Sequence, residues 1–177
     1  MEEMKINLCL TEAGSTVLHS HGINPETYGP AYDGESVGLD LYYCGEDTVL
    51  PGRNKWVAFD EPRIYLSTGV KINVPLGCVA LVKERGSITQ LGLLLRAGVI
   101  DPGYTDEIFV NLINIGEKDI TIPKGVKLPV QLIILPCYTN FNVISNLEYL
   151  EETVNAKRQA GSLGSSNDES ENENKNT

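Results

Sequence analysis

The sequence predicts an all-β fold, a sandwich or barrel built from short strands. Short segments of alternating or continuous apolar residues recur along the chain, and turn residues separate them. The 177 residues include 17 Gly and 9 Pro, which favours many turns over long helices. Apolar residues at helical spacing occur mainly at Leu147, Leu150 and Val154, enough for about two helical turns. Short strands with turns between them are typical of such folds.

The first half of the chain predicts strands on both sides of one long loop. Residues 5–10 alternate polar and apolar side chains and form the first expected strand. Residues 11–37 are punctuated by Gly and Pro, so we expect a surface loop there. The next expected strands are residues 39–43, 48–50, 56–59, 64–66 and 70–74.

The second half begins with a continuous apolar run at residues 78–82, which predicts a strand covered on both faces. Residues 88–91 fit one helical turn. The remaining expected strands are residues 93–95, 99–100, 108–112, 120–122 and 131–135.

The chain is long enough for one domain with a real core. We assign residues 1–154 to this β-domain, residues 155–167 to a mobile C-terminal arm and residues 168–177 to a disordered acidic tail. The tail has too few apolar side chains to offset its chain entropy. Leu163 is an isolated apolar residue in a Gly/Ser-rich stretch, which fits a plain linker or an arm that folds over a ligand.

Charge and cysteine content exclude several classes of function. The net charge of −10 argues against nucleic-acid binding, which needs a basic face. No apolar run reaches membrane-spanning length, and the first residues do not resemble a secretion signal. The four cysteines are widely spaced, which favours reduced thiols over a metal site. We therefore expect a cytoplasmic protein that binds neither membranes nor nucleic acids.

The central candidate site is the stretch of residues 98–108, where buried strands enter and leave a Pro-Gly turn. Pro102 presets the first corner, and Gly103 permits a positive φ at the second. We expect a tight hairpin with Asp101 and Tyr104 on its two shoulders and exposed peptide groups between them. The residues alone leave open whether Asp101 binds a ligand or only accepts amide hydrogen bonds within its own turn.

Five segments stand in one order along the chain: Gly38-Leu39-Asp40-Leu41, Arg85-Gly86-Ser87, Gly98 to Tyr104, Lys124 to Ile133, and Arg158 with residues 162–166. Together they closely resemble the five motifs of the trimeric dUTP diphosphatases (dUTPases), relatives of the dCTP deaminases. The resemblance extends over residues 5–167. It implies a jelly-roll-like β-domain, a homotrimer with shared active sites, and Mg²⁺-dependent hydrolysis of dUTP to dUMP and pyrophosphate.

The resemblance assigns the third segment to catalysis and uridine recognition. Asp101 matches the base that activates water for attack on the α-phosphorus, a role that contributes about 10² to 10⁴ in rate. Tyr104 matches the ring that packs beneath deoxyribose and excludes a 2′-hydroxyl. Backbone groups of the turn, including those at Gly98 and Ile100, are implied to read uracil.

The first, second and fourth segments are implied to hold the phosphates. Arg85 offers a guanidinium fork, and Gly86 and Ser87 add an amide and a hydroxyl. Gln131 is implied to contact phosphate or the catalytic water. Asp40 matches an acid that holds Mg²⁺ through water, which suits an ion bound mainly by substrate phosphates.

The fifth segment resembles the arm that closes over the site and excludes water. Arg158 matches a γ-phosphate contact, and Leu163 occupies the position of an aromatic that covers the base. Gly164, Ser165 and Ser166 match the phosphate-binding stretch of the arm.

The sequence departs from the family pattern at several positions. Gly86 stands where Ser is usual, and Leu163 replaces an aromatic. Leu95 stands where many relatives place an Asn that helps read uracil. The fourth segment has an extra residue and a Pro129 before Gln131, which predicts a β-bulge.

Two other functions fit parts of the sequence. A dCTP deaminase uses a glutamate on the strand that leaves the hairpin. The equivalent position here is Asn111, which cannot shuttle a proton, and Glu107 lies nearer the turn. A regulatory nucleotide-binding protein would use the 11–37 loop and the acidic tail to bind a partner.

Overall fold

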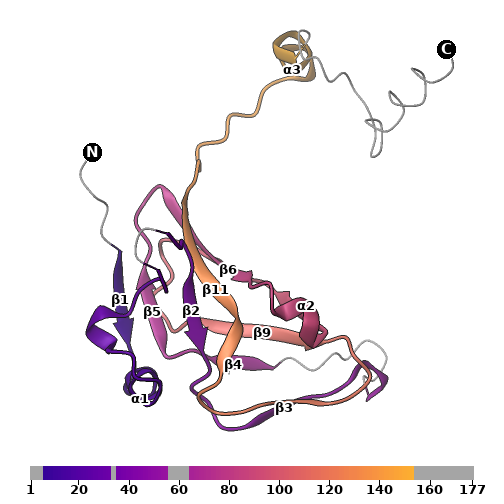
Figure 1. Cartoon of the computed structure of the whole chain (residues 1–177). Helices are drawn as coiled ribbons and strands as arrows, with labels where there is room; N and C mark the ends of the chain where they lie inside the picture. The colour runs from indigo at the N-terminus through magenta and orange to yellow at the C-terminus, as the bar shows by residue number, and fades with distance from the viewer. Residues whose placement is uncertain (1–5, 33–34, 56–63, 154–177) are drawn as a thin grey trace, which may run out of the picture. The chain divides into compact units, whose positions relative to one another are not determined.

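The computed structural model describes residues 6–32, 35–55 and 64–153. The chain divides into two compact units, residues 1–139 and 140–177. The elements of the first unit (Figure 1) are β1 (Asn7–Leu10), α1 (Glu12–Ser20), η1 (Pro25–Thr27), β2 (Leu39–Tyr42), β3 (Thr48–Leu50), η2 (Arg53–Lys55), β4 (Tyr65–Ser67), β5 (Val70–Asn73), β6 (Cys78–Glu84), α2 (Ile88–Leu91), β7 (Leu93–Arg96), β8 (Val99–Ile100), β9 (Phe109–Asn114), β10 (Ile120–Ile122) and β11 (Lys127–Pro136). The second unit contains α3 (Asn146–Thr153).

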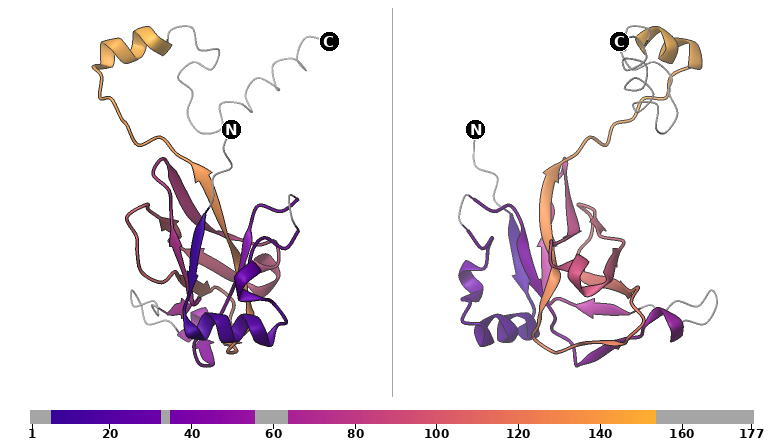
Figure 2. Two further views of the ribbon diagram at one scale, coloured as in Figure 1. Left: turned by 90° about the vertical axis from the view of Figure 1, so that its left-hand side faces the viewer. Right: turned by 45° about the vertical axis from the view of Figure 1, so that its right-hand side comes forward.

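The strands form small sheets in which every described pair is antiparallel. The largest sheet has the order β2-β11-β6-β8, and a second has the order β4-β9-β7. Two ribbons, β1-β5 and β10-β3, complete the body (Figure 2). This arrangement confirms the all-β class. Both expected helical turns, at residues 88–91 and near residue 147, are also confirmed.

The core lies between the sheets, and β9 shows how the sequence builds it. Ile108, just before β9, and Val110 and Leu112 within it are at most 1% exposed, whereas their neighbours point the other way. Each such side chain contributes about 1.5–3 kcal/mol through burial. The period of two in the sequence therefore fixes which face of β9 points inward.

The expected loop over residues 11–37 is wrong at its start, where the structure has α1. Thr11 caps this helix, because its side chain accepts a hydrogen bond from the Gly14 amide. Val17 and Leu18 are buried against a cluster with Tyr42. The helix is short, and its apolar residues occupy only one turn, so the surrounding Gly and Pro residues concealed it.

Two further expectations have definite outcomes. Cys78, Ala80 and Val82 of β6 are buried, but Val79 and Leu81 are only half-buried, so the prediction that both faces are covered is wrong. The predicted bulge is confirmed, because the register of β11 on β2 shifts before Gln131. The expected strand at residues 56–59 lies outside the described residues. None of the described helices is long and apolar enough to span a membrane.

Candidate active site

A group of polar side chains gathers across β2 and β11, at the end of β6. Asp40 on β2 lies opposite Gln131 on β11, which in turn lies opposite Lys83 on β6. Arg85 follows β6 directly, and its amide donates to the carbonyl of Pro129 at 2.9 Å. The bulge in β11 therefore helps to hold the residue that comes after β6.

The centre of this group is the carboxylate of Asp40, whose side chain is only 14% exposed. Its Oδ1 lies 2.9 Å from Nε of Arg85, and its Oδ2 lies 2.6 Å from Nζ of Lys127. Arg85 makes this contact through Nε of its guanidinium. The arrangement places two cations side by side around one acid.

Gly38 makes room for the side chain of Gln131. A Cβ at Gly38 would come within 1.9 Å of Oε1 of Gln131, so any larger residue would move that side chain. The amide nitrogen of Gln131 also donates to the carbonyl of Glu84 at 3.4 Å. This packing explains in physical terms why the first segment needs glycine.

The Arg85-Gly86-Ser87 stretch links β6 to α2 and is open to solvent at its centre. The amide of Ile88 donates to the carbonyl of Arg85 at 3.0 Å, and the Thr89 hydroxyl donates to the carbonyl of Gly86 at 2.9 Å. A Cβ at Gly86 would meet nothing within 4 Å. Gly86 and Ser87 are both exposed.

The turn after β8 differs in part from the expected hairpin. The Tyr104 amide donates to the carbonyl of Asp101 at 3.0 Å, so the turn itself is confirmed. The positive φ that Gly103 permits is not used, since its φ is not positive. The paired hairpin is wrong, because β8 pairs with β6 whereas β9 pairs with β4 and β7. The loop instead carries the chain from one sheet to another.

Gly98 fixes where this stretch begins. Its φ is +121°, and a Cβ there would lie 2.7 Å from the carbonyl oxygen of Val82. Its own carbonyl accepts from the Val82 amide at 2.8 Å. The close approach requires glycine. Ile100 is buried at the end of β8, and Asp101 emerges exposed immediately after it.

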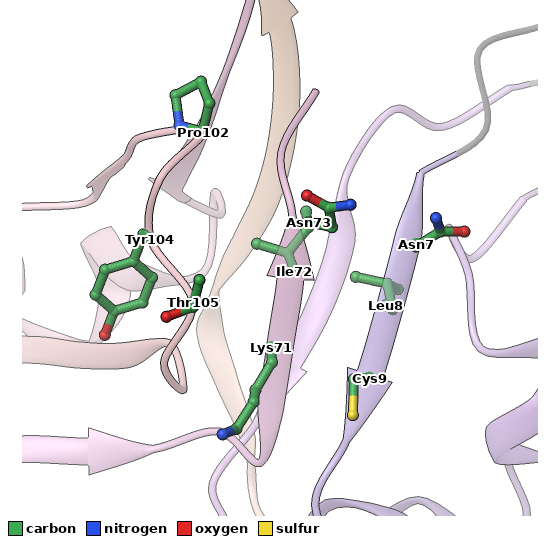
Figure 3. A pocket seen from close by; sticks show the side chains of 9 residues that line it. All are labelled: Asn7, Leu8, Cys9, Lys71, Ile72, Asn73, Pro102, Tyr104 and Thr105. Carbon is green, nitrogen blue, oxygen red and sulfur yellow. The ribbon is translucent and has the colours of Figure 1, made fainter. Parts of the chain in front are cut away.

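Tyr104 lies beside the turn and is 37% exposed as a whole residue. Its hydroxyl donates to the backbone carbonyl of Glu107 at 2.6 Å. Burial, with help from the carboxylates of Asp106 and Glu107, raises the pKa of this phenol. The ring also lines a cavity of about 280 Å³ with Pro102 and Thr105, across from β5 and β1 (Figure 3).

The two groups lie at opposite ends of β6. Ile100 pairs with Ala80, which places Asp101 beside Val79, whereas Arg85 follows the other end of the strand. Six residues of strand separate these points by about 20 Å. Within the part of the chain that the structure describes, no hydrogen bond or ion pair joins the Asp101 carboxylate to Arg85.

The remaining expected site residues, Arg158, Leu163, Gly164, Ser165 and Ser166, lie outside the described residues. The residues described include no group of three or more His, Cys, Asp or Glu side chains that could hold a metal ion. Both oxygens of Asp40 are already held by cations. Each oxygen keeps a second lone pair, so the carboxylate can still accept a hydrogen bond from a water of a bound ion.

A comparison with known families decides the relationship. The family model described as dUTPase matches residues 28–167. The chain belongs to the dUTPase family. The match extends across both groups of site residues and into the C-terminal arm.

Individual proteins that are similar to this dUTPase-family chain support the same assignment. A deoxyuridine 5′-triphosphate nucleotidohydrolase of Clostridium kluyveri is 32% identical over 146 residues, 80% of this chain and 94% of its own length. The structure of native EIAV dUTPase is 27% identical, covers 80% of this chain and 97% of its own, and has a TM-score of 0.58. A staphylococcal phage 80alpha dUTPase mutant with dUpNHpp has a TM-score of 0.63 at 16% identity, covering 92% of this chain and 98% of its own.

Two residues that contact the candidate site residues, Lys127 and Glu107, were missed by sequence reasoning. Lys127 lies within the fourth segment, but the sequence alone predicted no role for it. Its signal was a lysine at the start of a strand that has an acid on the neighbouring one. Glu107 was considered only as a proton shuttle, and its many local contacts have no signature in sequence.

Proposed function

We propose that the protein hydrolyses dUTP to dUMP and pyrophosphate by attack of water on the α-phosphorus. The observation that carries the proposal is the match to the dUTPase family over residues 28–167, a range that contains Arg85, Asp101, Tyr104 and Gln131. The exposed position of Asp101, at a turn held by a backbone hydrogen bond, supports the role of general base. A base must lie within hydrogen-bond reach of the water that it activates, and an exposed carboxylate meets this requirement.

The phosphates would be held by the group around Asp40. Arg85 presents its fork there, and Gly86 and Ser87 offer an amide and a hydroxyl at an exposed position. Gln131 would contact phosphate or the attacking water. The arm of residues 155–167 would close over the bound nucleotide with Arg158, Leu163, Gly164, Ser165 and Ser166, and would exclude water.

The substrate would bind between subunits of a homotrimer. Asp101 and Arg85 lie about 20 Å apart along β6, by the rise per residue of a strand. That distance is too long for one deoxynucleotide to have its base at the turn and its phosphates at Arg85 of the same chain. A second copy that brings its own Arg85 to the turn would complete the site.

Mg²⁺ would arrive with the triphosphate. This ion keeps several waters and is bound largely by substrate phosphates, so the protein need not supply a carboxylate cluster. When bound, it would neutralise phosphate charge. Asp40 would contact the waters of the ion through the lone pairs that Arg85 and Lys127 leave free.

The test is a nucleotide panel of dUTP, UTP, dTTP and dCTP, assayed for pyrophosphate and for ammonia with and without Mg²⁺. We expect pyrophosphate from dUTP far above the other three, lost when a chelator removes the metal. Ammonia from dCTP would favour a deaminase. Binding of dUTP without release of pyrophosphate would leave a regulatory nucleotide-binding protein and overturn the proposed hydrolysis.

A further inference from the structure

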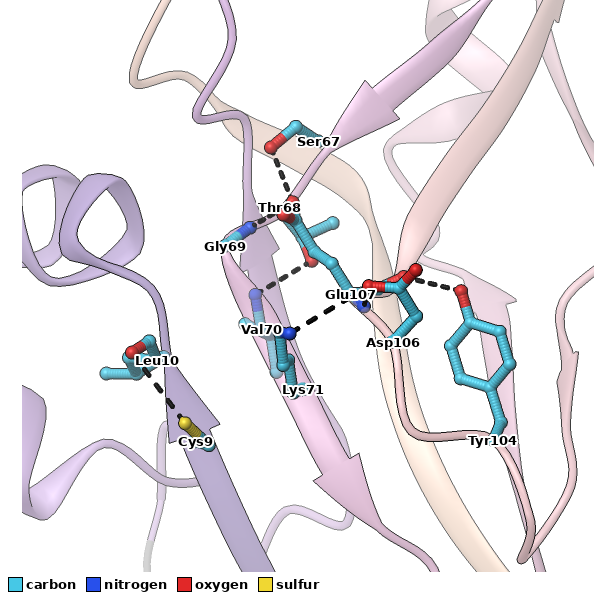
Figure 4. Close-up of polar contacts among 10 residues, drawn as sticks. All are labelled: Cys9, Leu10, Ser67, Thr68, Gly69, Val70, Lys71, Tyr104, Asp106 and Glu107. Atoms are coloured by element: carbon cyan, nitrogen blue, oxygen red, sulfur yellow. Dashed lines mark hydrogen bonds and ion pairs between the residues drawn. The ribbon is translucent and has the colours of Figure 1, made fainter.

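Glu107 stands where the loop from Asp101 ends and the chain enters the core. Its side chain turns away from solvent toward the connection between β4 and β5 (Figure 4). Oε1 accepts a hydrogen bond from the Gly69 amide at 2.8 Å and another from the Ser67 hydroxyl at 2.5 Å. Hydrogen bonds to a charged acceptor are about twice as strong as neutral ones. The carboxylate therefore ties the end of the loop to a different part of the fold.

The backbone of the same residue holds Tyr104. The Tyr104 hydroxyl donates to the carbonyl of Glu107 at 2.6 Å, as Figure 4 shows. Tyr104 is thus joined through Glu107 to the β4–β5 connection. The backbone of Tyr104 is held by the turn hydrogen bond to Asp101, and its hydroxyl is held by the Glu107 carbonyl.

The connection that receives Glu107 is itself firmly held. Gly69 has a φ of +66°, and a Cβ there would come within 2.5 Å of the Cα of Gly14 on α1. The carbonyl of Gly69 accepts from the Thr11 amide at 2.8 Å. Next to it, the buried Thr68 donates its hydroxyl to the carbonyl of Ile108 at 2.6 Å. Glu107 is therefore attached to a part of the molecule that cannot easily shift.

We propose that Glu107 is a positioning residue that fixes the ring of Tyr104 and thereby sets the preference for deoxyribose over ribose. This inference rests on the proposed function, in which the ring excludes a 2′-hydroxyl. The ring excludes a 2′-hydroxyl only if it cannot move, because a displacement of about 1 Å would make room for the extra oxygen. The two side-chain hydrogen bonds of Glu107 supply that resistance.

The neighbouring acid offers a matched control. Asp106 is 76% exposed and lies 3.8 Å from Nζ of Lys71, a distance typical of a weak surface pair. Its Oδ1 accepts from the Glu107 amide at 2.7 Å, and an asparagine keeps that acceptor. Asp106→Asn therefore removes one negative charge at the same place in the sequence without cutting the tie to β4.

The experiment compares wild type with Glu107→Ala, Glu107→Gln and Asp106→Asn. The measured quantities are the ratio of kcat/KM for dUTP and UTP, and the ratio of dissociation constants for UMP and dUMP. Glu107→Ala should lower both ratios about tenfold or more, the size expected for losing a hydrogen bond to a charged acceptor. Glu107→Gln keeps an oxygen for the Gly69 amide and should stay within about threefold of wild type, as should Asp106→Asn.

The ratios separate positioning from general support, since a merely structural role would lower both substrates alike. Unchanged ratios in Glu107→Ala, or an equal fall in Asp106→Asn, would overturn the inference. If Glu107→Ala fails to fold, Ser67→Ala removes one of the same hydrogen bonds from the β4 side and should lower both ratios in the same direction; unchanged ratios there would also overturn it. A wild type that prefers dUMP but releases no pyrophosphate would overturn the hydrolysis alone, and the binding ratio would still decide the role of Glu107.

Discussion

Replacing Asp40 by asparagine tests the two-cation group directly. The change keeps the size of the side chain but removes the charge that Arg85 and Lys127 share, at 2.9 and 2.6 Å. Hydrogen bonds to charged groups contribute about 1.5–3 kcal/mol each. Because the cationic side chains are 33% and 39% exposed, solvent screening reduces the sum. We expect a loss of about 1–3 kcal/mol in the free energy of unfolding.

A second ion pair supplies the control. Lys124 lies 2.6 Å from Glu46, the same separation as Lys127 from Asp40, but these side chains are 54% and 87% exposed. Glu46→Gln should therefore change stability by less than about 0.5 kcal/mol. The comparison contrasts a largely buried acid held by two cations with an exposed acid held by one, at an equal distance from lysine to carboxylate.

The assay is thermal unfolding at one fixed protein concentration, since an oligomer's melting temperature depends on concentration. For a domain of this size, about 1 kcal/mol shifts Tm by about 2–4 °C, so Asp40→Asn should lower Tm by roughly 2–12 °C. Binding of a nonhydrolysable dUTP analogue should weaken in the same variant, because the phosphate-binding cations lose their support. If Asp40→Asn melts like Glu46→Gln and binds the analogue like wild type, Asp40 does not organise the group.

Four other outcomes are expected. Asp101→Asn should lower kcat by at least about two decades with little change in analogue binding, and normal turnover would remove Asp101 from the mechanism. Truncation after Asn155 should leave the proposed trimer intact by light scattering but depress pyrophosphate release; full activity would show that the arm has no catalytic part. Gly38→Ala should weaken analogue binding by displacing Gln131 at small cost in stability, because the clash is with the far end of a flexible side chain; unchanged affinity would contradict this. Burial, with a smaller contribution from Glu107, raises the pKa of the Cys44 thiol to about 11. The thiol therefore favours folding below about pH 9, and this contribution is lost as pH rises toward 11, so Cys44→Ala should flatten that part of the stability curve in alkaline urea titrations.

Much of the fold followed from patterns that depend on near neighbours. The period of two in residues 108–112 predicted the buried face of β9, and Pro129 predicted the bulge that brings Gln131 opposite Asp40. The turn at Asp101 followed from Pro102 in the same way. In each case the deciding interaction lies within a few residues along the chain.

The predictions that were wrong concern features that depend on contacts between residues far apart in the sequence. Helix α1 holds its place partly because Gly14 packs against Gly69, and nothing near Gly14 in the sequence reveals that contact. The strands around the Asp101 turn were expected to pair with each other, but β6 and β4 offered them other partners. The roles of Lys127 and Glu107 likewise arise from partners many residues away, Asp40 and Gly69.

The separation of Asp101 and Arg85 along β6 has a genetic consequence. In a shared site, the base of one chain works with the guanidinium of another. A subunit that lacks only Asp101 and a subunit that lacks only Arg85 can therefore still supply one complete site between them. Chains with Asp101→Asn and chains with Arg85→Ala, each inactive alone, should regain part of their activity when unfolded together and reassembled. Two defective genes expressed in one cell would then produce a working enzyme.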